Sequence, residues 1–139
     1  MPEPISNAKA EEIIRQCLHE EGYKLSPERG WEETGVDIIA VKDGKKFYIE
    51  VIGYKKAGPA RAKDFFESFF RSISRLKDGA NNLVMAMPDL HRIGLPARAR
   101  NYGPAWERLG DAFPEMEIWL IKCETPYSYS KYSWKEWLR

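Results

Sequence analysis

The fold of this chain is decided by the stretch GVDIIAVKDGKKFYIEVIG, which occupies residues 35–53. Two runs rich in β-branched and apolar residues, 36–41 and 46–52, flank the dipeptide Asp43-Gly44. Asp-Gly between two such runs is among the strongest short-range signals for a β-hairpin. We therefore predict two antiparallel strands joined by a two-residue type I′ turn.

The length of this turn fixes which residues face one another across the hairpin. Lys42 then pairs with Lys45, and the same register places Asp37 opposite Glu50. Because side chains alternate along a strand, both carboxylates share one face. That face also carries Ile39, Tyr48 and Ile52. The other face collects Val36, Ile38, Ala40, Phe47, Ile49 and Val51. A three-residue loop would instead shift the register by one and separate the two acids.

Two facing carboxylates in an otherwise apolar hairpin need compensation, because like charges repel and burial makes ionisation of both costly. A divalent cation supplies it. Mg²⁺ commonly binds one or two protein carboxylates together with water and phosphate oxygens, and it lowers the pKa of a bound water, as phosphodiester hydrolysis requires. The alternative is that Asp37 or Glu50 reaches solvent or pairs with Lys55, Lys56 or Arg71.

Periodicity predicts the remaining elements. An amphipathic helix starts after Ser6 or Asn7 and ends at Gly22, and a long helix over about 60–77 carries a wide apolar stripe. A helix from Pro96 to Leu109 or Gly110 is interrupted at Gly103-Pro104. Further strands are expected over 23–28, 83–87 and 116–121.

This order of elements predicts an α/β fold, a single three-layer domain with a central mixed β-sheet flanked by helices. The length of 139 residues suits one packed domain, which we expect over residues 1–124. Residues 125–139 form an aromatic C-terminal tail without a clean period. We expect this tail to pack on the domain or on a partner subunit.

Several classes of protein are not favoured by the sequence. There is no apolar run of the roughly 20 residues that a membrane span needs, and the N-terminus lacks the features of an export signal, so we expect a cytoplasmic protein. Cys17 and Cys123 lack close partners and are expected to be reduced, buried thiols. His19 and His91 lack partners at zinc or catalytic spacing and are expected on the surface.

Basic residues are unevenly distributed although the net charge is only +1. The segment 42–63 has seven basic and two acidic side chains, whereas acidic residues gather in 11–33. The folded molecule is thus expected to present one basic side to a polyanion, the alternative being an ordinary mixed surface. The candidate nucleic-acid-binding residues are Lys55, Lys56, Arg61, Lys63 and Arg92.

The two runs GVDIIA (35–40) and FYIEV (47–51), followed by Gly53-Tyr54 and a Phe-rich helix, resemble the PD-(D/E)XK nuclease superfamily of the restriction-endonuclease-like fold. Within that superfamily the sequence is similar to small proteins of the Holliday-junction-resolvase-like, Mrr-like and XisH-like types. The resemblance spans about residues 8–122. It implies that Asp37 and Glu50 bind the metal, Mg²⁺ or Mn²⁺, and that Glu11, with Glu12 as the competing choice, is the acid of the first helix. It also implies that the ligand is DNA, and it allows a homodimer.

The sequence departs from that family at the position two residues after Glu50, where the family has Lys and this chain has Ile52. Lys55 or Lys56 can replace the missing cation if Gly53 bulges the strand. Lys63 can replace it from the helix, and so can Arg71, which stands where related nucleases often carry Gln. The simpler interpretation is a solvated surface for Lys55 and Lys56, and for Arg71 an ion pair with Glu67.

These observations leave two main hypotheses. The first is a metal-dependent deoxyribonuclease whose catalytic residues are Asp37, Glu50, Lys55 and Arg71. The second, motivated by Ile52, is a catalytically degenerate member of the fold that serves as a DNA-binding or assembly subunit. A third is a protein-interaction module that uses the aromatic tail.

Overall fold

In the computed structural model, which describes residues 3–28 and 35–138, the hairpin consists of β2 (Ile38–Lys42) and β3 (Lys45–Val51). Lys42 pairs with Lys45, which confirms the predicted register. Asp43 and Gly44 have φ angles of 52° and 76°, so both occupy the left-handed region that a type I′ turn requires.

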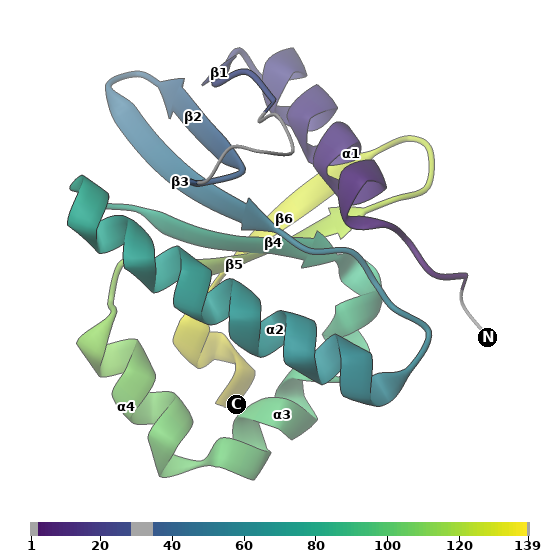
Figure 1. Ribbon diagram of the computed structural model, residues 1–139, viewed down its shortest axis with the longest axis vertical. Coiled ribbons are helices and arrows are strands. Elements are labelled where there is room, and N and C mark those ends of the chain that lie inside the picture. Colours follow the sequence, from purple (N-terminus) through teal and green to yellow (C-terminus); the bar gives the residue numbers. More distant parts are fainter. Residues whose placement is uncertain (1–2, 29–34, 139) are drawn as a thin grey trace.

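The sheet in the described part of the chain has six strands in sequence order (Figure 1). The others are β1 (Lys24–Leu25), β4 (Leu83–Pro88), β5 (Met116–Lys122) and β6 (Ser128–Ser133). Strands β3, β4 and β5 are parallel, whereas β1, β2 and β6 pair antiparallel with their neighbours. The carboxyl ends of β3 and β4 therefore lie at the same edge of the sheet.

Helices cover both faces of this mixed sheet, which confirms the predicted three-layer α/β fold (Figure 1). Helix α1 (Asn7–Glu20) packs on one face. The other face is covered by α2 (Gly58–Ile73), α3 (Leu95–Tyr102) and α4 (Pro104–Ala112). The described residues also form three short 3-10 helices: η1 (Ser74–Asp78), η2 (Asp89–Ile93) and η3 (Trp134–Leu138).

The two apolar cores follow from the alternation along β3. Phe47, Ile49 and Val51 face α1, whereas Tyr48 and Ile52 belong to the core under α2. One assignment from the sequence is wrong: Val36 packs against the core on the α2 side and not on the α1 side. It precedes the first residue of β2, so the alternation of the strand does not apply to it.

The predicted boundaries hold for most elements. Ser6 caps α1 by accepting a hydrogen bond from the Lys9 amide, and Gly103, with a φ of 49°, separates α3 from α4 as expected. The long helix turns into the 3-10 helix η1 at Ser74. The strand expected over 23–28 is limited to Lys24–Leu25, and β6 and η3 were not predicted.

Among the described helices, none has the length and hydropathy needed to cross a membrane.

Candidate functional site

Asp37 and Glu50 lie at the open end of the hairpin, one step beyond the last ladder pair of Ile38 and Ile49. Both are buried: Asp37 is 8% exposed and Glu50 is 1% exposed. The Val51 amide donates a hydrogen bond of 2.8 Å to Asp37 Oδ2. That bond holds the Asp37 carboxylate beside β3, next to the residue that follows Glu50.

A guanidinium group of α2, that of Arg71, forms an ion pair with Glu50. Arg71 Nε lies 3.9 Å from Glu50 Oε1. The simpler interpretation of the sequence, an ion pair between Arg71 and Glu67, is wrong. Glu67 instead pairs with Lys63, at 3.8 Å. An arginine stays protonated at all ordinary pH values, so Arg71 can balance charge at Glu50 but cannot act as a general base there.

Ile52 occupies the position where the nuclease superfamily that the sequence resembles carries a lysine, and it is 1% exposed within the core under α2. Of the proposed replacements, Lys55 Nζ lies 2.9 Å from Asp64 Oδ2 on α2. Lys63 pairs with Glu67, as described above, and Lys56 is exposed. Arg71 is therefore the candidate cation that the structure brings to Glu50.

Glu11 of α1 is engaged by Arg15, whose Nε donates a hydrogen bond of 2.8 Å to Glu11 Oε2. The same guanidinium donates to the carbonyl oxygens of Ser26 and Asp37 at 2.6 and 3.0 Å. Glu11 thus orients an arginine that ties α1 to the backbone at Asp37. Within residues 3–28 and 35–138, no group of three or more His, Cys, Asp or Glu side chains is arranged to hold a metal ion.

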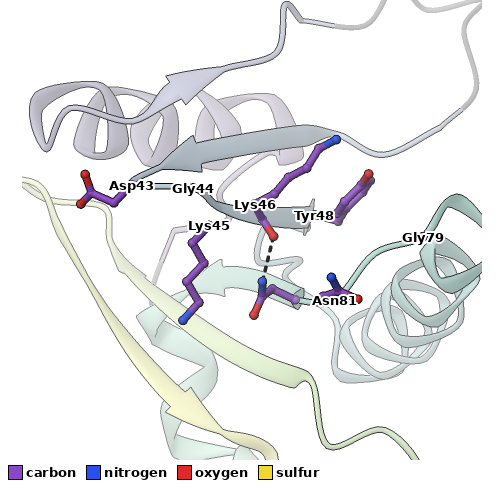
Figure 2. A pocket seen from close by; sticks show the side chains of 8 residues that line it. Asp43, Gly44, Lys45, Lys46, Tyr48, Gly79 and Asn81 are labelled. Carbon is purple, nitrogen blue, oxygen red and sulfur yellow. Dashed lines mark hydrogen bonds between the residues drawn. The ribbon is translucent and has the colours of Figure 1, made fainter.

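The basic residues of segment 42–63 fall into two groups at opposite ends of β3, so the expectation of a single basic side needs correction. Lys45 and Lys46 begin β3, beside a hollow at the hairpin turn (Figure 2). Their side chains point away from one another, and their ammonium groups lie over the rings of Phe47 and Tyr48. They do not converge on one ligand.

The second group lies where β3 and β4 end. The residues that follow these two strands carry the basic side chains Lys55, Lys56, Arg61, Lys63 and Arg92. Arg92 of η2 donates a hydrogen bond of 2.6 Å to the hydroxyl of Tyr132. All five nucleic-acid-binding candidates therefore belong to segments that begin at this end of the sheet, although the Arg92 guanidinium is held against Tyr132 of β6.

A cleft of about 300 Å³ opens among these segments, and the sequence did not reveal it. Four polar or charged side chains line it: Tyr54 after β3, Arg61 of α2, His91 of η2 and Arg98 of α3. Parallel β-α-β connections bring the carboxyl ends of strands together, and such edges are preferred places for ligand sites in α/β folds.

His91 was expected on the surface and is instead only 7% exposed, whereas His19 is exposed as expected. His91 Nε2 lies 2.9 Å from the carbonyl oxygen of Gly53, so this nitrogen carries the proton and donates. Burial, followed by the charges of Arg98 and Arg61, lowers the His91 pKa from its ordinary 6.5, against the opposing effects of the Gly53 carbonyl and Asp64. The ring is therefore neutral at neutral pH.

We expect His91 to make the protein less stable as the pH falls below about 6.5, because the unfolded chain takes up a proton that the buried ring resists. The contribution of His91 to the free energy of unfolding is fully present above its pKa in the unfolded chain. It declines as the pH falls from that value toward the lower pKa of the folded protein, by at most about 1.4 kcal/mol per pH unit. Melting temperatures between pH 7.5 and 5.5 measure this. The His91→Gln variant retains an amide donor but does not titrate, so its melting temperature should fall less. Parallel curves for both proteins would contradict the prediction.

The two cysteines are free thiols, as expected. Cys17 is buried and Cys123 is half-buried. Burial raises the pKa of Cys17, and it raises that of Cys123 to about 11. Both are thus protonated and weakly nucleophilic at neutral pH.

No protein-family model matches the chain, and searches of curated proteins and of solved structures gave no significant match. The fold defines the class of the protein as a three-layer α/β domain with a mixed sheet.

Proposed function

We propose that this protein is a DNA-binding domain with a restriction-endonuclease-like fold. The observation that carries the proposal is the gathering of Lys55, Lys56, Arg61, Lys63 and Arg92 in the segments that follow β3 and β4. A group of lysines and arginines at one edge of a sheet attracts a polyanion and makes contacts to phosphates. The order of the elements and the hairpin acids, which resemble the nuclease superfamily, favour DNA as that polyanion.

Two pairs of lysines offer a matched test of this surface: Lys56 and Lys63 follow β3, whereas Lys45 and Lys46 begin it. We expect the double variant Lys56→Gln, Lys63→Gln to bind duplex DNA more weakly and to reduce the slope of log K against log salt by about two. The double variant Lys45→Gln, Lys46→Gln should behave like the wild type. Fluorescence anisotropy over a salt series measures both. Equal losses in the two variants would indicate a diffuse charge effect, and an absence of DNA binding by the wild type would reject the proposal.

A second candidate function is Mg²⁺-dependent hydrolysis of DNA at Asp37 and Glu50. It is favoured by the hydrogen bond from the Val51 amide, which holds the Asp37 carboxylate one residue from Glu50 along β3. Two carboxylates suit Mg²⁺ or Mn²⁺, so these residues fit the ion that the resemblance implies. A bound ion would supply a polarised phosphoryl oxygen and an acidified water. Arg71 would then balance the charge of the phosphate and of Glu50.

The same site also supports the degenerate alternative, in which the acids remain without hydrolysis. Ile52 is buried in the core, and Lys55 and Lys63 form ion pairs with Asp64 and Glu67 of α2. A protonated arginine does not replace a lysine that activates water. We therefore rank DNA binding above hydrolysis for this chain.

Titration calorimetry with Mg²⁺ and Mn²⁺, together with cleavage of supercoiled, linear and branched DNA, separates these two functions. If the site is active, Asp37→Asn and Glu50→Gln should abolish both metal binding and cleavage, whereas Glu67→Gln on α2 should retain them. Cleavage that survives in both acid variants would exclude this site. Metal binding without cleavage would support a site that lacks only its catalytic cation.

A further inference from the structure

The cleft formed by Tyr54, Arg61, His91 and Arg98 has an anion-binding character that DNA binding alone does not require. It lies where β3 and β4 end, between the first half of α2, η2 and the start of α3. Its volume of about 300 Å³ is at the lower end of the range for small-molecule sites. Ile93, which is 89% exposed, adds an apolar side chain to its lining.

The two arginines of the cleft, Arg61 and Arg98, are half-buried and carry positive charge. Within residues 3–28 and 35–138, neither Arg61 nor Arg98 forms an ion pair with a carboxylate. Asp64, an acid of α2 whose charge acts on His91, is paired with Lys55. The ion pairs among the described residues therefore leave the two positive charges of the cleft without a compensating carboxylate.

Both guanidinium groups are nevertheless held in place. Arg61 Nη1 donates hydrogen bonds of 2.8 Å to the carbonyl oxygens of Lys55 and Lys56, and its guanidinium lies 4.7 Å from the centre of the Tyr54 ring. The Arg98 guanidinium lies 4.9 Å from the centre of the Phe65 ring. Stacking on rings fixes the plane of a guanidinium and leaves N–H donors at its edge for an anion.

We propose that this cleft binds a phosphate monoester that carries an apolar or planar group, of about the size of a mononucleotide. A monoester carries a charge of roughly −1.5 to −2 at neutral pH, which matches two guanidinium groups better than the single charge of a phosphodiester does. Tyr54 and Ile93 provide the apolar surface for the attached group. Two sources share this chemistry: a free phosphorylated small molecule and the phosphorylated end of a nucleic-acid strand.

Titration calorimetry of the full chain with dAMP and with deoxyadenosine tests the phosphate requirement. We expect dAMP to bind saturably and deoxyadenosine at least about tenfold more weakly. The variants Arg98→Gln and Arg61→Gln should each weaken dAMP binding about tenfold or more. Arg100→Gln, an exposed arginine on the same helix and outside the cleft, is the matched control and should bind like the wild type.

Equal binding of dAMP and deoxyadenosine, or wild-type affinity in both Arg98→Gln and Arg61→Gln, would overturn the proposal. If Arg98→Gln fails to fold, the test uses Arg61→Gln, which should bind dAMP more weakly. It also uses the NMR resonances of the His91 ring, which should shift when dAMP is added to the wild type. A 5′-phosphorylated oligonucleotide that binds better than its 5′-hydroxyl form assigns the ligand to a strand end. Saturable dAMP binding without that preference assigns it to a small molecule. The inference does not rest on the wider DNA surface, whose failure appears separately as lost duplex binding.

Discussion

Replacement of Trp134 by alanine is expected to lower the free energy of unfolding by about 3–5 kcal/mol. Trp134 of η3 is 4% exposed, and its ring stacks on that of Trp106 of α4 with centroids 3.9 Å apart. Each indole N–H donates to the backbone carbonyl oxygen of the other tryptophan, at 2.9 and 2.8 Å. The truncation thus leaves a large cavity and removes the buried hydrogen bond that the Trp134 indole donates, so the carbonyl oxygen of Trp106 loses this donor.

Urea unfolding followed by circular dichroism measures this loss without relying on tryptophan fluorescence. Trp134→Phe retains most of the stacked surface but loses its N–H donor, so we expect an intermediate loss of about 1–3 kcal/mol. Trp106→Ala combined with Trp134→Ala should cost less than the two single losses added together, because both remove one shared contact. A change below about 1 kcal/mol in Trp134→Ala would mean that η3 is not part of the cooperative unit.

The C-terminal elements show why part of the fold was not visible in the sequence. In β6, Tyr129 packs toward the α1 core and Tyr132 toward the α2 core, and the other residues of the strand are exposed. No single face of this strand is apolar, so the period-two signal of a half-buried strand is absent. The pairing with β5 comes from backbone hydrogen bonds at the sheet edge, which leave little trace in side-chain type.

The hairpin, by contrast, was predictable because its determinants are local. The Asp43-Gly44 turn and the alternation around it are contained in about 17 residues, and they fixed the register that brings Asp37 toward Glu50. The partner of Glu50 was not fixed by such local rules. Arg71 reaches it only because α2 packs across the sheet, and a rule based on helical spacing favoured Glu67 instead.

The cleft was hidden from the sequence for the same reason. Its polar side chains come from four segments, and His91 is buried by a contact with Gly53, 38 residues away. A lone histidine in a predicted loop gives no sign of such a contact. The connection from β3 through α2 to β4 creates the contact, so this part of the site could be found only in three dimensions.

Replacement of Gly53 by alanine, which adds a single methyl group, is expected to lower the free energy of unfolding by about 2–4 kcal/mol. A Cβ at this position would lie 2.0 Å from the carbonyl oxygen of Ile5 and 2.7 Å from the carbonyl carbon of Ser6. These are backbone atoms that cannot swing aside. The N-terminal segment must therefore move away from the end of β3.

That movement would break several hydrogen bonds at once. Ile5 and Tyr54 exchange two backbone hydrogen bonds of 2.9 and 2.7 Å, and the Gly53 amide donates to Asn7 Oδ1 at 2.7 Å. The Gly53 carbonyl accepts from His91. Because Tyr54 and His91 line the cleft, Gly53→Ala should also weaken the binding of dAMP if the cleft binds it.

Gly58→Ala is the matched control, because its Cβ would meet only the Arg61 side chain at 3.7 Å, an ordinary van der Waals contact. It lies at the start of α2, where alanine is at least as favourable as glycine, so its melting temperature should be unchanged or slightly higher. The melting temperature of Gly53→Ala should instead fall by roughly 10 °C. If the two variants melt together, the N-terminal segment is not held against β3 in solution, and Gly53 is not the junction that positions Tyr54 and His91.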